Sequence, residues 1–462
     1  MNIDERITAP ALAERFAQFW ALSAEKMARI ERNFDPALGA PVFTVNGRYT
    51  ARGWTEWTQG FQFGSMLLQF DAAGDARWLE RGRAGTFQVM PLHITHRGVH
   101  DHGFNTVSTF GNLLRLHLEH RVPPDPWQRT ACELAIKASA AVQAMRWTAL
   151  PDGGFIYSFN GPHSLFADTI RSLRVLALGH RLGHLLMDEN DARVSLLERL
   201  VLHARTTARY TLFYGEGRDA YDTAPGRVAH ESLFNINDGR YRCPASQQGY
   251  SPFTTWTRGL AWIMLGFAEQ LEFLDTLPPA ALDPWGGATA VRTFMERAAR
   301  AASDFYIANS AADGIPYWDT GAPELHRLGA WRERPAEPFN DWEPVDSSAA
   351  AIAAQGLLRL GHWLSLRGGG QAAPGRRYFQ AGLTVLDALL RPPYLAENPE
   401  HEGLILHSLY HRPNGWDAVP AGRKVPCGEA SMWGDYHARE AVLLVQRLAN
   451  NEPYLTFWGP QP

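Results

Sequence analysis

The chain has 462 residues, of which 45% are hydrophobic and 20% charged, so it can bury a large core and is neither disordered nor collagen-like. Lys and Arg number 44 against 48 Asp and Glu, which gives a formal net charge of -4. Because this balance creates no broad positive field, we expect neither nucleic acid nor an anionic membrane as a partner.

The three cysteines, Cys132, Cys243 and Cys427, lie far apart and are odd in number. This favours a reducing compartment over a disulfide framework, and no C-x-x-C pair indicates zinc. The chain starts with no basic segment followed by an apolar run, and no apolar stretch reaches the about 18 residues of a membrane helix. We expect a cytoplasmic protein without a metal or other cofactor.

Six long stretches carry apolar residues at helical spacing and are predicted to be α-helices. They span residues 126–145, 191–212, 256–273, 291–307, 347–364 and 430–449. Strand signals are few and short. Much of the Pro and Gly falls in connections that are predicted to be loops, such as 219–227, 335–344 and 368–374. Because helices of the same character continue on both sides of these loops, we expect one catalytic domain over 1–462.

A weak internal repeat precedes six helical segments. Each time, a polar cluster with aromatic residues or glycine leads directly into a helix of small or apolar residues. The clusters begin at Trp54, His100, Phe166, Thr255, Val345 and Ser431. Their intervals of roughly 45 to 90 residues each leave room for one further amphipathic helix.

Six such helix pairs can close into an all-α ring, with one set of helices inside and one outside. Every inner helix of such a ring begins at the same end, so the six clusters would converge on one mouth. The alternative is six ordinary helix caps, because Asp, Ser and Thr bond the free N–H groups at helix starts. Caps, however, do not require Trp, Arg and His beside them.

Two aspartates occupy the helix starts of adjacent repeats, Asp101 in H-D-H-G-F and Asp168 in F-A-D-T-I-R. Side by side in an aromatic pocket, their charges would oppose joint ionisation, so the pKa of one would rise toward neutrality. A carboxylic acid that is still protonated near pH 7 can act as a general acid. The alternative is a structural role for both as helix caps.

Seven motifs follow one another along most of the chain. They are W-T-Q-G-F at 57–61, H-D-H-G-F at 100–104, A-D-T at 167–169, Q-G-Y-S with W-T-R-G-L-A-W at 248–262, I-P-Y-W-D at 315–319, D-S-S-A-A-A at 346–351 and W-G-D-Y at 433–436. In content and order they resemble the unsaturated glucuronyl hydrolases, glycoside hydrolase family 88, and more distantly the unsaturated rhamnogalacturonyl hydrolases. Seven matches in series are hard to obtain by chance.

The resemblance implies an (α/α)6 barrel, in agreement with the repeat, and an unusual glycoside hydrolase. In this family the non-reducing-end uronic acid left by a polysaccharide lyase carries a C4=C5 double bond, which the enzyme hydrates. A proton adds at C4, water adds at C5, and the hemiketal opens with loss of the remaining sugar. The reaction needs a group that gives a proton and then accepts one from water.

The resemblance also implies roles for single residues. Asp168 would be the general acid and base, and Asp101 its partner, which holds the substrate near the double bond and tunes Asp168. The other motifs would supply substrate-binding side chains: Trp57, His100, Gln248, Arg258, Trp262 and Trp433.

Three of these binding side chains have alternative roles. Trp57 and Trp262 would stack on the sugar, or else pack in the core. Arg258 would attract the uronate carboxylate or a sulfate, or else pair with an inner-helix carboxylate such as Asp346.

The chain departs from the family pattern in three places. His102 stands where Leu is common; it could alter the charge beside Asp101, and its H-x-H pair is a weak metal signal because further ligands are not evident. Gln247 stands where His is expected. The segment 214–248 is expanded, so the family's substrate-contacting His is either lost or replaced by His230, which could equally be a surface residue.

The favoured function is therefore hydration of unsaturated uronyl oligosaccharides. One alternative is a related barrel hydrolase for unsaturated galacturonyl or saturated glucuronide substrates. Another is a carbohydrate-binding barrel without chemistry, although binding an anionic sugar does not call for two adjacent carboxylates. The sequence leaves open the glycan source, the linkage, sulfation and whether copies of the chain form a homo-oligomer.

Overall fold

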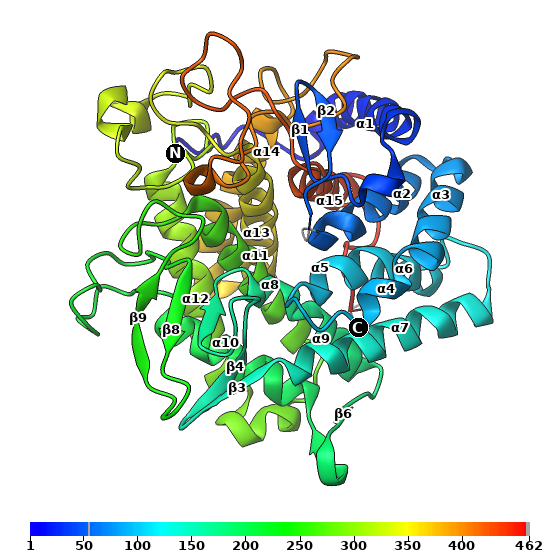
Figure 1. The fold of residues 1–462 in the computed structure, drawn as a ribbon, viewed down its shortest axis with the longest axis vertical. Coiled ribbons are helices and arrows are strands. Elements are labelled where there is room, and N and C mark those ends of the chain that lie inside the picture. Colours follow the sequence, from blue (N-terminus) through cyan, green and yellow to red (C-terminus); the bar gives the residue numbers. More distant parts are fainter. Residues whose placement is uncertain (54–55, 459–462) are drawn as a thin grey trace.

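The computed structural model describes residues 1–53 and 56–458, which form a ring of helices (Figure 1). Within these ranges, six buried inner segments contact one another in cyclic order and close the ring. They are α2 (Gln59–Ala73), α5 and α6 (His102–Thr106 and Asn112–Leu118, joined by a π-helical turn Val107–Gly111), α8 and α9 (Thr169–Ser172 and Arg174–Arg181), α11 (Thr257–Leu274), α13 (Ser347–Ser365) and α15 (Met432–Ala449).

Outer helices alternate with these inner segments along the chain and pack against them from outside. They are α1 (Ala13–Asn33), α3 (Ala76–Gln88), α7 (Pro126–Met145), α10 (Leu196–Tyr210), α12 (Gly287–Asn309) and α14 (Ala372–Leu389), with a short α4 (Pro91–Ile94) before α5. The predicted all-α (α/α)6 barrel is confirmed. No helix of residues 1–53 and 56–458 combines the length and apolar character that crossing a bilayer requires.

The two sets of helices differ in composition as their positions require. Every residue of α11 is buried, and so is every residue in the first turns of α13, which consist of two serines and the alanines 349–351. A helix that is apolar or small all round can be stable only where protein surrounds it. The outer helices α1 and α10 instead alternate buried apolar residues with exposed polar ones.

Glycines let the inner helices approach closely. A Cβ at Gly103 of α5 would lie 1.9 Å from the carbonyl oxygen of Ser172 in α8, and one at Gly356 of α13 would lie 2.9 Å from the amide nitrogen of Leu265 in α11. Real side chains never approach backbone atoms this closely, so alanine would push the helices apart. The glycine of H-D-H-G-F therefore sets the distance between α5 and α8.

The six sequence clusters lie at the N-terminal ends of the inner segments, as predicted, although Trp54 and Thr55 of the first cluster fall outside the described residues. Asp346 and Ser431 do cap their helices, accepting N–H groups of Ser348 and Gly434. The side chains of Asp101 and Asp168 make no such capping bond. Ordinary capping therefore explains part of the repeat but not its two catalytic candidates.

Two sequence predictions about helix limits are wrong. The helix predicted over 191–212 begins only at Leu196, because Ser195 caps it by accepting the Glu198 N–H; β7 (Arg193–Val194) precedes it and pairs with β6 (Leu186–Met187). The loop predicted over 368–374 ends early, since α14 begins at Ala372. Pro374 is tolerated there because N–H groups in a first helical turn have no helical partner.

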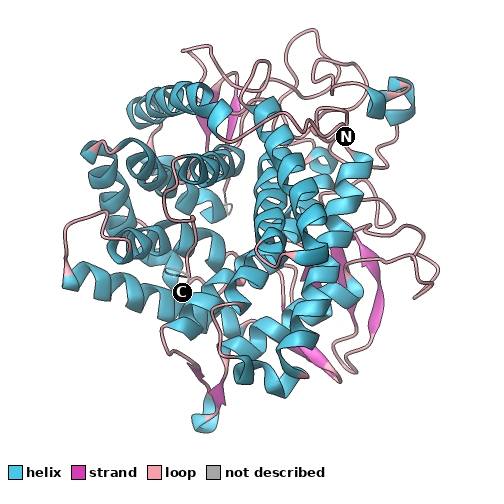
Figure 2. Ribbon diagram, turned by 180° about the vertical axis from the view of Figure 1, so that it is seen from behind, coloured by secondary structure: helices cyan, strands magenta, loops and turns pink. Residues whose placement is uncertain are grey.

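Short strands occupy small groups at the edge of the ring (Figure 2). Two hairpins consist of β1 (Phe43–Val45) with β2 (Arg48–Thr50) and β3 (Trp147–Leu150) with β4 (Gly153–Ile156). Besides these hairpins and the β6–β7 pair, a three-stranded group joins β5 (Ser164–Phe166), β8 (Glu231–Phe234) and β9 (Tyr241–Ala245) in antiparallel order.

The β5–β8 pairing continues one residue beyond β5, where the Ala167 N–H donates to the His230 carbonyl at 2.9 Å. This bond fixes the chain directly before Asp168.

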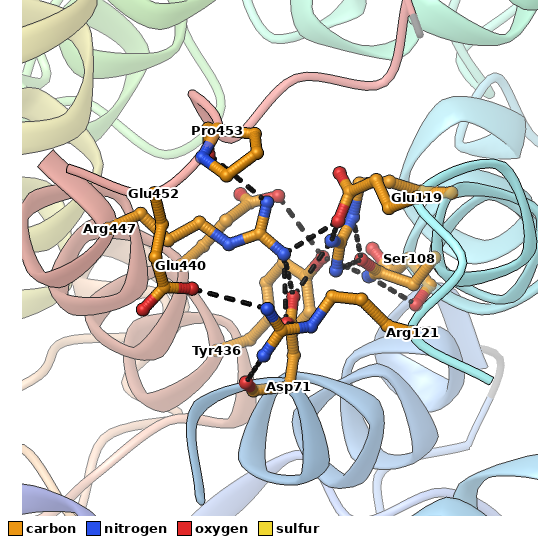
Figure 3. A network of polar contacts seen from close by, with 11 residues as sticks. Asp71, Ser108, Glu119, Arg121, Tyr436, Glu440, Arg447, Glu452 and Pro453 are labelled. Carbon is orange, nitrogen blue, oxygen red and sulfur yellow. Dashed lines mark hydrogen bonds and ion pairs between the residues drawn. The ribbon is translucent and has the colours of Figure 1, made fainter. Parts of the chain in front are cut away.

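The C-terminal ends of the inner helices are joined by buried charges (Figure 3). Asp71 near the end of α2 accepts Arg115 of α6 and Arg447 of α15, each at 2.7 Å. Arg121 contacts the same carboxylate at 2.7 Å, and Glu119 accepts Arg447 at 2.7 Å. Because these residues follow the helix starts by a full helix length, the network lies at the end of the ring opposite the six clusters.

Candidate active site

A pocket of about 240 Å³ opens at the N-terminal ends of the inner helices. Its wall brings together seven of the nine predicted site residues: Trp57, His100, Asp101, Asp168, Gln248, Arg258 and Trp262. They come from the starts of α2, α5, α8 and α11 and from the segments just before them. Convergence of the clusters on one mouth, predicted from the repeat, is thus observed for these four starts.

His100 lies between the two aspartates. Its Nε2 is 3.0 Å from Oδ1 of Asp168 and 3.8 Å from Oδ1 of Asp101. Asp101 is buried, and the side chain of Asp168 is only 13% exposed. The two carboxyl groups and one imidazole therefore form a compact cluster that is largely shielded from bulk water and that faces the pocket.

The two carboxyl groups have pKa values shifted in opposite directions. Burial raises the pKa of Asp101, and the nearby charge of Asp168 raises it further. Burial alone would also raise the pKa of Asp168, but the charge and hydrogen bond of His100 bring it below the usual value. One pKa rises, as the sequence predicted for a close pair; it is that of Asp101 and not that of the expected general acid.

The same contacts act on His100. Burial alone would lower the pKa of its imidazole, but Asp101 and Asp168 raise it above the ordinary value of 6.5. Near neutral pH the cluster thus favours a protonated His100 bound to an ionised Asp168, with Asp101 the carboxyl group that more readily keeps a proton.

Aromatic rings form the floor of the pocket. Trp262 is only 2% exposed, and its ring lies 4.9 Å from that of Phe104. Trp57 is half-buried and stacks on Trp433 at 5.1 Å. The two predicted roles of Trp57 and Trp262, core packing and a sugar-facing surface, are therefore compatible: each packs below the pocket and also contributes to its wall.

Trp433 itself does not belong to the wall. It is fully buried, and its indole N–H donates to the hydroxyl of Ser348 at 2.9 Å. The ring supports Trp57 and Tyr410 from below, with centroids 5.1 and 5.0 Å away. The resemblance implied that Trp433 contacts the substrate directly. Its position instead lets it act on the substrate only by supporting the rings of Trp57 and Tyr410.

Arg258 forms the structural pair that was one of its two predicted roles. Its guanidinium is buried and donates to Asp346 at 3.1 Å, to Gln248 at 2.8 Å and to the carbonyl oxygen of Tyr410 at 2.7 Å, and also to that of Leu409. Because Asp346 also caps α13, this one ion pair joins α11 to α13 beneath the pocket wall.

His230 is buried and lies just behind the wall. Its Nδ1 accepts the N–H groups of Gln247 at 2.9 Å and Gln248 at 3.3 Å, so in the neutral ring the proton sits on Nε2. Burial lowers its pKa to about 4, which keeps it neutral. The surface position considered for His230 is wrong: it holds the main chain that carries Gln248.

The departures from the family pattern are also placed. His102 bonds Ser139 of the outer helix α7 at 2.7 Å and, from the segment between α4 and α5, the His96 carbonyl at 2.9 Å; burial lowers the pKa of His102 to about 4. It is therefore an uncharged structural residue. Gln247 lies in the wall and donates to Asn160 at 3.0 Å. No group of residues in the described part of the chain has the donors of a metal site.

Sequence reasoning missed about half of the wall. Phe104 and Trp256 stand within the motifs and could have been named from them, whereas Phe159 lies outside every motif. Tyr410, His411, Asn414 and Trp416 belong to a loop without helical periodicity, and only Pro413 and Gly415 mark it as a turn. No signal in a single sequence connects that loop to α11.

Comparisons with known proteins agree with the motifs. No family model matches. The chain is 27% identical to the unsaturated glucuronyl hydrolase of Bacillus sp. (strain GL1) over 87% of its own length and 89% of the relative's. It is 23% identical to the unsaturated chondroitin disaccharide hydrolase of Streptococcus pyogenes serotype M1, over 87% and 84%.

A solved structure shows that the fold is shared. The crystal structure of the unsaturated glucuronyl hydrolase from Bacillus sp. GL1 superimposes with a TM-score of 0.71 at 22% identity, covering 96% of this chain and 99% of that one. Along most of its length this chain is therefore similar in sequence and in fold to an unsaturated glucuronyl hydrolase, in agreement with the resemblance of its motifs.

Proposed function

We propose that the chain is a glycoside hydrolase that hydrates the C4=C5 double bond of a non-reducing-end unsaturated uronic acid in lyase-derived oligosaccharides. The observation that carries this function is the placement of Asp101 and Asp168 beside one imidazole in one ring-lined pocket, where neither carboxylate caps its helix. The names of the relatives support the same substrate class.

Asp168 is proposed as the group that gives and then regains the proton. Its carboxyl group is ionised in the free protein, so it must first be protonated, and the His100 Nε2–H at 3.0 Å is a donor within reach. A bound uronate brings a second negative charge and displaces water, and both effects raise the pKa of Asp168. Burial already raises the pKa of Asp101, so this neighbouring carboxyl group can hold a proton and supply it to the cluster.

The proton balance closes over one turnover. Asp168 gives its proton to C4, which places positive character on C5 and the ring oxygen. Water then adds its oxygen to C5 and returns a proton to the Asp168 carboxylate. The resulting hemiketal opens to a C5 ketone, and the hemiacetal left at C1 releases the remaining sugar with its own oxygen. Because C1 is not attacked, carboxylate separation does not predict retention or inversion.

The test follows the ultraviolet band of the conjugated enol carboxylate while lyase-derived disaccharides are mixed with the protein. We expect the band to disappear with the wild type and to disappear at least about 100-fold more slowly with Asp168→Asn, since proton transfer by a placed side chain contributes that much. Asp283→Asn, at an exposed carboxylate outside the pocket, is the matched control.

Two outcomes would contradict the proposal. Turnover of saturated glucuronides at a similar rate would show that the double bond is not needed. Binding of the disaccharide with the band left intact would indicate a carbohydrate-binding barrel without chemistry.

A cytoplasmic site of action in polysaccharide degradation is part of the proposal. It is supported by three free cysteines, of which Cys132 and Cys427 are buried. Assembly into a homo-oligomer stays a prediction, which sedimentation of the purified protein would test.

A further inference from the structure

We propose that two copies of the chain associate through the outer helix α7, which carries apolar side chains along its solvent-facing side. The two helices pack antiparallel around a two-fold axis near residue 136. This inference concerns assembly and does not rest on the function proposed above.

The outer side of α7 is apolar over its whole length. The helix runs along the outside of the ring (Figure 1), and its inner side packs on α5 and α9. On the outer side, Trp127, Leu134 and Met145 are 77%, 57% and 46% exposed. Spacings of seven and eleven residues bring these side chains to one face of the helix. We call this the α7 face; its other members are Thr130, Ala131, Ala138, Ala141 and Val142, each exposed or half-buried.

Such a face is unusual among the outer helices of this ring. The exposed positions of α10, for example, are occupied by the charged residues Glu198 and Arg209. In α7 the one fully exposed charge is Arg129 in the first turn, which lies outside the α7 face and binds Glu133 at 2.9 Å. Exposed apolar side chains that are grouped on one surface mark an interaction site.

The order of large and small side chains on the α7 face fits a second copy. In an antiparallel pair centred near residue 136, residues equally far before and after this point lie opposite one another. Leu134 then lies opposite Ala138 of the second copy, and Trp127 opposite Met145, whose flexible side chain can adapt to the ring. A parallel pair would instead place Trp127 on Trp127 and Ala138 on Ala138. Large side chains facing smaller ones pack with fewer gaps, so the antiparallel pair is favoured.

The charges beside the α7 face fit the same arrangement. Glu133 and Lys137 lie on one flank of α7, and a two-fold axis across antiparallel helices brings that flank of both copies to the same side. Glu133 then lies about 3 Å along the helix axis from Lys137 of the second copy. Within the described chain, Lys137 pairs with no carboxylate, so it is available for this contact. A helix that lies on a membrane would instead carry several Lys and Arg beside its apolar face.

The size of the α7 face indicates a weak, reversible dimer. From residue 127 to residue 145 the face is about 27 Å long and about 10 Å wide. A standard interface buries about 800 Å² per partner, more than this stripe covers. Leu92 of α4 and Met187 of β6 are also exposed and lie on elements that contact α7, so they would add to the buried area.

The first experiment measures the mass of the full chain in solution by sedimentation, from about 1 µM to about 300 µM protein, the range in which weak interfaces associate. For the wild type we expect the mass to rise from that of one chain toward that of two. Leu134→Lys buries a charge at the centre of the interface and should weaken association at least about tenfold. Glu25→Lys, at an exposed position of the outer helix α1, is the control and should associate like the wild type.

A charge exchange tests the contact between the two copies of α7. Glu133→Lys and Lys137→Glu each bring like charges together, so each variant alone should stay a single chain. An equimolar mixture should form the dimer again, because each changed residue then lies beside the opposite charge of the other variant. In a parallel pair these residues lie on opposite sides, and mixing would restore nothing.

Denaturant unfolding at low protein concentration checks that the variants fold; we expect midpoints close to that of the wild type, because the changed side chains lie at the surface. A wild type that stays a single chain over the whole range would overturn the proposal. So would association of Leu134→Lys equal to that of the wild type, or a mixture of the two charge variants that does not associate.

Discussion

Among single residues, His100 determines which of the two aspartates has the lower pKa. Both carboxyl groups are buried, and burial alone would raise both pKa values. The imidazole at 3.0 Å from Asp168 and 3.8 Å from Asp101 stabilises the ionised form of the nearer one more. The sequence could predict that two close carboxyl groups would have different pKa values. It could not predict which group would keep its proton, because that depends on where the imidazole lies between them.

The first prediction concerns the titration of His100. In Asp168→Asn one of the two charges that raise the pKa of His100 is lost while burial, which lowers it, remains. We expect the His100 ring signal in NMR to titrate above the ordinary value of 6.5 in the wild type and at distinctly lower pH in Asp168→Asn. His100→Gln identifies the signal, and an unchanged titration would show that the two side chains do not interact.

At the scale of elements, the sequence predicted the inner helices better than the loops between them. The polar clusters located the starts of α5, α8, α11, α13 and α15 to within a few residues. The loop 409–417 could not be predicted, because the bonds that place it join Arg258 to Leu409 and Tyr410, about 150 residues further along the chain. The roles assigned to the site residues stay predictions, whereas their meeting in one pocket is observed.

The second prediction concerns the packing of α5 on α8. Gly103→Ala would place a Cβ 1.9 Å from the Ser172 carbonyl oxygen, so α5 must move and carry Asp101 away from Asp168. We expect unfolding free energy to fall by about 1–3 kcal/mol, as for other overpacked sites, and kcat to fall more than tenfold.

Denaturant unfolding and the ultraviolet assay measure the two effects of Gly103→Ala. Gly370→Ala is the control, since a Cβ there meets no atom within 4 Å. Full activity in Gly103→Ala would show that the spacing of α5 and α8 does not set the geometry of the carboxylates.

In the molecule as a whole, one end of the ring of helices carries the pocket and the opposite end carries a structural network of ion pairs. The mouth gathers side chains that can meet a substrate, and the far end joins α2, α6 and α15 through Asp71, Arg115 and Arg447. These helices close the ring between its first and last inner segments. Sequence reasoning did not foresee this network, because charged residues at helix ends ordinarily indicate solvent exposure.

The third prediction concerns this closure. Burial alone would raise the pKa of Asp71, but Arg115 and Arg447 bring it below the usual 3.8. Its stabilising effect is therefore present above the unfolded-state pKa and is lost as the pH falls through the lower folded-state value. Asp71→Asn leaves Glu119 as the one remaining carboxylate partner that Arg115 and Arg447 share in this network, and should cost up to about 3–5 kcal/mol at pH 7.

Denaturant unfolding at several pH values measures the effect of Asp71→Asn. The difference from the wild type should shrink as the pH falls below the usual aspartate range. Asp4→Asn, whose partner Arg6 is exposed, should behave like the wild type. A stability difference for Asp71→Asn that is the same at all pH values would show that the charge of Asp71 is not what closes the ring.

The most direct test of the account is to locate the oxygen that enters the products. The wild type is supplied with an unsaturated disaccharide in ¹⁸O-labelled water, and the products are trapped by rapid reduction and analysed by mass spectrometry. If Asp168 protonates the double bond, the label appears at C5 of the former uronic acid, and in deuterated water one deuterium appears at C4. Label at C1 with an intact double bond would mean ordinary glycoside cleavage and would contradict the proposed chemistry of the pocket.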